Sequence, residues 1–181
     1  MNKVLENKKI AMVIAFRDFR DAEYFTPKKI LEEAGAEIKT ASNKMGLALG
    51  TEGGDARIDL LIKDLKPAEF DAIVFAGGPG CLDALDNEDS YRVAKEAVSQ
   101  NKVLAAICIS SVILAKAGVL SGKRATVWSS EADKQPIKIL IENGATYIPR
   151  PVIADGKIIT GNGPAAAKEF GEMIIGVLTE N

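Results

Sequence analysis

Apolar runs of strand length alternate with segments of helical period along almost the whole chain, and this alternation constrains the fold more than any other feature. Strands nearly continuous in Val, Ile and Ala, separated by helices, are typical of a mostly parallel sheet covered on both faces. We therefore expect an α/β fold of the flavodoxin-like type, with helices on both faces of the sheet. The strand order expected for that type is 2-1-3-4-5.

The same pattern predicts the individual elements. The main strands are expected at residues 9–16, 36–42, 70–76, 102–107 and 124–128. Helices are expected at residues 22–34, 89–100, 110–117, 134–143 and 165–178. Short strands or a hairpin are expected within residues 44–65, and two further short strands at residues 145–148 and 157–160. Because 181 residues suit one domain and no linker is visible, residues 1–181 are expected to form a single domain.

Charge and hydropathy argue against several classes of partner. The net charge is −2, from 23 basic and 25 acidic residues spread along the chain, so neither nucleic acid nor a membrane surface is an expected partner. No apolar run approaches the ~20 residues of a membrane-spanning helix, and the first residues lack the apolar core of a signal peptide. The two cysteines, Cys81 and Cys108, fit a reducing compartment. A cytoplasmic location is therefore expected.

The chain contains no histidine. A mechanism that needs an imidazole base, a histidine metal ligand or a Cys-His pair must therefore use another group. This absence excludes more chemistry than any motif in the chain includes.

Cys108 follows the fourth expected strand directly, and the next expected helix begins within two residues. This layout, with small Ala106 and Ser110 on either side of the turn, predicts a nucleophile elbow. The N-terminus of the following helix would favour a thiolate over a thiol. The alternative is a buried cysteine that packs as a small apolar side chain.

Two other segments are expected at the same edge of the sheet. Gly77 and Gly78 end the third strand, where glycines let the backbone approach a bound group and aim N–H donors at it. Glu23 lies in the first helical turn after the first strand. The alternatives are an ordinary glycine-rich turn and a solvated carboxylate at a helix start. Three neighbouring charged residues are expected to have such a surface role, namely Asp18, Arg20 and Asp21.

Residues 161–166 match a dinucleotide-binding glycine pattern, but no second strand with an acidic residue about 20 positions on follows it. NAD binding is therefore rejected. The same loop, with Gly163 and with Pro164 at the start of a helix, is expected to form one rim of the cysteine pocket. Cys81 is expected to pack in the interior, with a resolving thiol as the alternative.

The ordered set of Glu23, Gly77-Gly78 and the segment 105–108 resembles the ThiJ/PfpI superfamily (DJ-one-type, class I glutamine amidotransferase-like). Residues 114–126 are similar to the stretch after the superfamily's cysteine, and residues 155–164 resemble its final strand and pocket loop. The resemblance runs from about Lys9 to Leu178. It implies a flavodoxin-like sandwich that forms a homodimer or higher homo-oligomer. It also implies no metal and no organic cofactor.

The resemblance implies roles for particular residues. Cys108 corresponds to the reactive thiolate and Glu23 to the carboxyl that contacts it, while the backbone amides of Gly78 and Ile109 correspond to the oxyanion positions. We expect a raised pKa for Glu23 and a lowered pKa for Cys108, titrating as a coupled pair. Ile109 stands where the intracellular proteases carry a histidine. Trp128 lies near the position of another pocket histidine and is expected to fill the pocket wall.

Three functions follow from this resemblance. The first is cysteine-dependent carbonyl chemistry of the glyoxalase or deglycase type, with a small aldehyde or a glycated adduct as substrate. The second is redox sensing or stress protection, in which an oxidant converts Cys108 to a sulfenic or sulfinic acid without turnover. The third, intracellular peptidase activity, fits least because both family histidines are missing.

Overall fold

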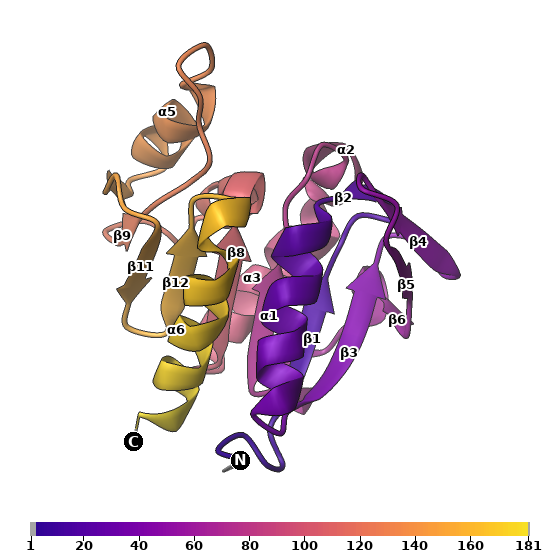
Figure 1. The fold of residues 1–181 in the computed structure, drawn as a ribbon. Coiled ribbons are helices and arrows are strands. Elements are labelled where there is room, and N and C mark those ends of the chain that lie inside the picture. The colour runs from indigo at the N-terminus through magenta and orange to yellow at the C-terminus, as the bar shows by residue number, and fades with distance from the viewer. Residues whose placement is uncertain (1–2, 181) are drawn as a thin grey trace.

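The computed structural model describes residues 3–180, which form a seven-stranded sheet with helices packed against it (Figure 1). The strand order is β11-β12-β8-β7-β1-β3-β6. In that order the strands span Val152–Asp155, Ile158–Gly161, Val103–Ile107, Ala72–Phe75, Lys9–Val13, Glu37–Ser42 and Leu60–Leu61. All neighbouring pairs are parallel except β11 and β12. The predicted α/β class is confirmed, and so is the relative order of the first four main strands.

Helices cover both faces of this sheet. On one face lie α1 (Asp21–Glu33) and α6 (Ala167–Thr179), which pack against each other. The other face carries α3 (Glu88–Ser99) and α4 (Ser111–Lys116), with α5 (Gln135–Glu142) packed on α4. Buried side chains of β1 alternate between the two faces, because successive residues of a strand point to opposite sides. This is the two-sided burial that the sequence pattern predicts.

The register of the parallel strands brings three chain segments to one edge. Val13 of β1 pairs with Phe75 of β7, and Phe75 pairs with Ala106 of β8. The segments that leave these strands therefore emerge together at the carboxyl end of the sheet, where ligands of parallel α/β proteins are usually bound.

The prediction for the fifth strand is wrong. β12 takes the place beside β8, whereas β9 (Arg124–Ala125) pairs with β10 (Thr146–Tyr147) in a separate two-stranded sheet. All four residues of β12 are buried, as a strand covered on both faces requires, but Arg124 is exposed. The antiparallel partner of β12 is the neighbouring β11, which the sequence pattern does not predict.

The segment of residues 44–65 contains the expected hairpin. β4 (Leu47–Gly50) and β5 (Asp55–Arg57) are antiparallel, and β2 (Arg17–Phe19) adds a third strand parallel to β4. The sequence pattern predicts neither β2 nor the short helix α2 (Cys81–Leu85). Short 3-10 turns occur at Ile62–Asp64, Pro67–Glu69, Cys108–Ser110 and Pro164–Ala166. Within residues 3–180, no helix has both the length and the apolar character needed to span a bilayer.

Candidate active site

Cys108 occupies a strained turn at the end of β8. Its backbone φ of +66° lies in the left-handed region, which a residue with a Cβ rarely adopts. Such a conformation costs on the order of 1–3 kcal/mol and persists only where the surroundings enforce it. Here the Ser110 hydroxyl donates to the carbonyls of Ile107 (2.7 Å) and Phe75 (3.0 Å). The strand-to-helix turn has the geometry expected of a nucleophile elbow.

The helix after this turn differs from the expectation. Cys108 begins a 3-10 turn, and α4 itself contains only six residues. A helix this short supplies a weak dipole, so the local electrostatics depend on individual amides. The backbone N–H groups of Ile109 and Gly78 favour the charged form of the Cys108 sulfur and so lower its pKa.

Glu23 lies in the first turn of α1 with its side chain fully buried. Its Oε2 accepts a hydrogen bond of 2.9 Å from the Gly77 amide. The Arg20 amide in turn donates to the Gly77 carbonyl at 3.0 Å, which ties the start of α1 to the end of β7. Glu23 Oε1 is buried and has no hydrogen-bond partner among residues 3–180. A buried oxygen in this state can accept a proton or a substrate hydrogen bond.

Gly77 is where Glu23 and Cys108 meet. A Cβ at position 77 would lie 2.7 Å from Glu23 Oε2, 2.8 Å from Cys108 Cβ and 2.9 Å from the Ile107 carbonyl oxygen. Gly78 has φ +118°, and a Cβ there would lie 2.4 Å from the Arg20 amide nitrogen. Both positions therefore require glycine for close approach of the carboxyl, the sulfur and the backbone.

Burial is the largest influence on the pKa values of the two reactive groups. It raises the pKa of Glu23 to about 7, against the opposing effects of the Cys108 thiol, the Gly77 amide and the Arg20 guanidinium. Burial also raises the pKa of the Cys108 thiol, and the charge of Glu23 raises it further. The thiol and the carboxyl therefore titrate as a coupled pair.

The raised carboxyl pKa agrees with the prediction, but the predicted lowering of the thiol pKa is wrong. Cys108 is only 7% exposed, and its neighbour is a carboxyl that ionises first. The two amides oppose these effects only in part. In the free protein, burial and the neighbouring carboxylate therefore favour the neutral thiol of Cys108.

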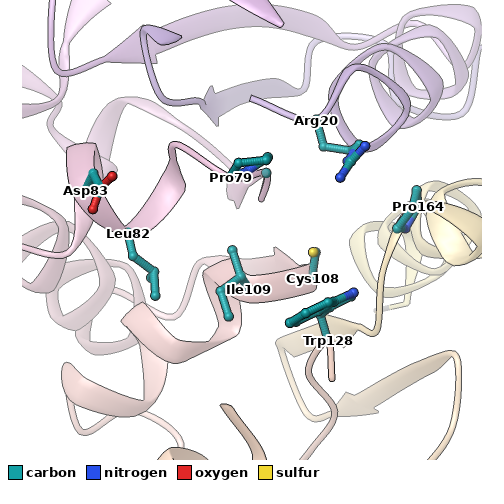
Figure 2. A pocket seen from close by; sticks show the side chains of 9 residues that line it. Arg20, Pro79, Leu82, Asp83, Cys108, Ile109, Trp128 and Pro164 are labelled. Carbon is teal, nitrogen blue, oxygen red and sulfur yellow. The ribbon is translucent and has the colours of Figure 1, made fainter. Parts of the chain in front are cut away.

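A cavity of about 500 Å³ opens at Cys108 (Figure 2). It is lined by Arg20, Gly78, Pro79, Leu82, Asp83, Cys108, Ile109, Trp128 and Pro164. This volume suits a small organic ligand. Within residues 3–180, no three His, Cys, Asp or Glu side chains are grouped in a way that could hold a metal ion.

Most of the residues expected at the site lie in or beside this cavity. Trp128 and Pro164 line it, and the Trp128 amide donates to the Cys108 carbonyl at 3.3 Å. Gly163 does not line the cavity but lies beside Trp128, where a Cβ would be 3.5 Å from the indole Cδ1. Gly77 lies against Cys108 and Glu23 and also does not line it.

Arg20 and Asp21 do not have the surface role that the sequence pattern suggests. Arg20 lines the cavity. Asp21 is 8% exposed and accepts hydrogen bonds from the amides of Glu52 (2.8 Å) and Gly54 (2.7 Å), so it fixes the tip of the β4–β5 hairpin. A charged residue just before a helix is usually solvated, and nothing local in the sequence signals that β2 pairs with the distant β4.

The short helix α2 supplies a wall that sequence reasoning missed. Leu82 and Asp83 of this helix line the cavity, together with Pro79 just before it. A helix of five residues is too short to show a hydrophobic period. Cys81 of the same helix is fully buried and donates to the Ala76 carbonyl at 3.6 Å, which fits the packing role expected for it.

Comparisons with known proteins match this architecture along most of the chain. Residues 8–176 match the DJ-1/PfpI family. The crystal structure of a ThiJ/PfpI domain protein from Brachyspira murdochii has a TM-score of 0.89 and 35% sequence identity, covering 96% of this chain and 97% of that one.

Two relatives from archaea are also similar. MJ0967 of Methanocaldococcus jannaschii is 37% identical over 178 residues, which is 98% of this chain and 85% of the relative. The Pyrococcus abyssi protein named deglycase PYRAB04690 is 32% identical over 153 residues, or 84% of this chain and 89% of the relative. With the elbow cysteine, the buried glutamate and the sheet order already described, these matches establish that the chain belongs to the DJ-1/PfpI family.

Proposed function

We propose that the protein is a cysteine-dependent enzyme that acts on small carbonyl compounds, with glyoxalase- or deglycase-like chemistry. One observation carries this proposal: Cys108 opens into a cavity while a buried carboxyl with a pKa of about 7 lies beside it. A group that titrates near neutral pH can both accept and return a proton, which is the requirement for general acid-base catalysis. The Pyrococcus abyssi relative is named a deglycase, which supports the deglycase-like form of this proposal.

The first step is an addition to the carbonyl carbon. As Cys108 Sγ forms a bond to that carbon, its proton passes to ionised Glu23 and the carbonyl π electrons move to the oxygen. The amides of Gly78 and Ile109 favour negative charge on the sulfur in the free protein, which supports their proposed role in stabilising that oxyanion. Glu23 then returns the proton to the oxygen, giving a neutral hemithioacetal.

An α-oxoaldehyde adduct can react further without any imidazole. Glu23 removes the proton from the former aldehyde carbon, and an enediol forms. Protonation at the neighbouring carbon gives a thioester on Cys108. Water hydrolyses this thioester to a 2-hydroxy acid and regenerates the thiol, so atoms and electrons balance with water as the only co-reactant.

Methylglyoxal consumption tests the proposal. The wild type is expected to convert methylglyoxal to lactate, and Cys108→Ala and Glu23→Gln are each expected to lose at least about a hundredfold in kcat/KM. Cys81→Ala is the matched control, because Cys81 is buried away from the cavity lining. Its activity is expected to stay within about threefold of the wild type. Equal turnover by wild type and Cys108→Ala would contradict the proposal.

Redox sensing through Cys108 remains the alternative, but the geometry favours it less. Sensor cysteines combine a low pKa with good access to solvent, whereas Cys108 is nearly buried and its thiol pKa is raised. Intact mass after treatment with peroxide separates the two functions. Oxygen addition that Cys108→Ala abolishes, in a protein that does not consume methylglyoxal, would favour the sensor.

Peptidase activity has the weakest support of the three functions. Ile109 occupies the position after the cysteine, and the chain contains no histidine to protonate a leaving amine. We expect no peptide hydrolysis above the rate shown by Cys108→Ala.

A further inference from the structure

Arg20 is the one cationic side chain that lines the cavity, and the rest of residues 3–180 leaves most of its hydrogen-bonding capacity unused. Its Nε is buried without a partner. Its guanidinium makes one side-chain hydrogen bond within residues 3–180, from Nη1 to Glu52 Oε1 at 3.4 Å. Glu52 is 57% exposed at its side chain, so this ion pair contributes little. A guanidinium has five N–H donors in a fixed fork, and most of those donors remain available here.

The position of Arg20 points to the reacting end of the cavity. In Figure 2 its side chain projects into the cavity on the side of Cys108 and Pro164, whereas Asp83 lies beyond Leu82 toward the other end. The charge of Arg20 also acts on Glu23, the partner of Cys108. A ligand group held by Arg20 would therefore lie in the same part of the cavity as a carbon attached to Cys108 Sγ.

We propose that Arg20 binds the carboxylate of the substrate, so that the preferred carbonyl compounds carry a carboxylate beside the reacting carbonyl, as 2-oxo acids such as glyoxylate do. A carboxylate matches the guanidinium fork with two parallel hydrogen bonds, and only Nη1 has a side-chain partner within residues 3–180, at 3.4 Å. This assignment rests on the proposed function only for the addition of Cys108 to the neighbouring carbonyl. It makes Arg20 a determinant of substrate class.

Paired alkylating reagents test the charge preference. The Cys108 thiolate attacks iodoacetate and iodoacetamide at the same carbon and displaces iodide from both. The reagents differ mainly in one negative charge, so the ratio of their rate constants cancels any change in the thiolate population. The ratio for iodoacetate over iodoacetamide is expected to fall about tenfold in Arg20→Gln and to be largely kept in Arg20→Lys.

Arg17→Gln is the matched control for this experiment. Arg17 is a nearby exposed arginine on β2 whose guanidinium lies over the Phe16 ring, 5.5 Å from its centroid, and it does not line the cavity. Its removal changes the net charge by the same amount and is expected to leave the ratio unchanged. A ratio that is the same in wild type and Arg20→Gln, or that falls equally in Arg17→Gln, would overturn the inference.

A binding measurement separates failure of this inference from failure of the proposed function. In Cys108→Ala, which cannot form a covalent adduct, calorimetry is expected to show glyoxylate binding that weakens about tenfold when Arg20→Gln is added. Equal glyoxylate binding by the single and double variants would overturn the carboxylate site, whatever the reactivity of Cys108. An unreactive Cys108 in the wild type, with glyoxylate binding that depends on Arg20, would contradict the proposed function while supporting the carboxylate site.

Discussion

The two cysteines of this protein are both buried and both lie after strands of the same sheet, yet their surroundings differ. Cys81 begins α2 in relaxed backbone, is fully buried and donates to one carbonyl. Cys108 has a strained backbone, lines a cavity and shares its environment with a carboxyl and two amides. Burial raises the pKa of both thiols. The comparison indicates that reactivity depends on access and on a proton acceptor, because burial alone has the same effect on both.

The largest difference is expected in alkylation of the native protein. A short pulse of iodoacetamide should label Cys108 at least about a thousandfold faster than Cys81, because Cys81 reacts only when the core opens. Mass spectrometry of the peptides that contain each cysteine measures the two rates. Labelling of both cysteines at similar rates would remove the distinction between them.

Glu23→Gln tests the buried carboxyl, which only Cys108 has as a neighbour in this comparison, through the free energy of unfolding. Between pH 4.5, the ordinary pKa of a glutamate, and about 7, the folded protein keeps a proton on Glu23 that the unfolded chain has lost. Since the folded state then binds more protons, the free energy of unfolding falls as pH rises through this window. The difference of about 2.5 pKa units corresponds to about 3 kcal/mol.

Urea unfolding at about pH 5 and about pH 8 measures this effect. The wild type is expected to lose about 2.5 kcal/mol relative to Glu23→Gln between the two conditions, because glutamine cannot ionise and pH 5 already lies above the ordinary pKa of a glutamate. A constant difference between the two proteins would show that the carboxyl titrates normally.

Gly77→Ala tests the close approach that distinguishes the surroundings of Cys108. The added Cβ would lie within 3 Å of Glu23 Oε2 and Cys108 Cβ, so a loss of about 1–3 kcal/mol in the free energy of unfolding is expected. Slower alkylation of Cys108 should accompany it. Gly176→Ala is the control, because a Cβ there meets nothing within 4 Å and alanine is preferred in a helix by about 1 kcal/mol.

The smallest effect is expected at the other cysteine. Cys81→Ala removes a buried sulfur and its weak hydrogen bond, which should cost about 1 kcal/mol in the free energy of unfolding. The alkylation rate of Cys108 should stay within about twofold of the wild type. A large change in that rate would show that Cys81 takes part in the site.

The sequence pattern was sufficient to predict the strand that ends at Cys108, the glycines after β7 and the position of Glu23. Each of these depends on local residues next to a strongly apolar run. The structure places β12 beside β8, where the segment 124–128 was expected. This could not be predicted in the same way, because both segments are apolar and strand-like. Only tertiary packing selects the one that is buried at every position.

The cavity wall was harder to predict for the same reason. Arg20 lies in a charged stretch that looks solvated, and its place at the cavity depends on the pairing of β2 with the distant β4. The pKa of Cys108 was misjudged because position in the chain suggests a helix terminus but does not reveal the extent of burial. Long-range pairing and burial are properties of the whole fold.

The pH dependence of Cys108 alkylation by iodoacetamide, compared between wild type and Glu23→Gln, is the most direct test that Glu23 controls the sulfur. Because the ionised carboxyl raises the thiol pKa, its removal is expected to shift the midpoint of the alkylation profile to lower pH by about one unit or more. Superimposed profiles, with both midpoints near the ordinary thiol pKa of about 8.5, would contradict the coupling of the two groups.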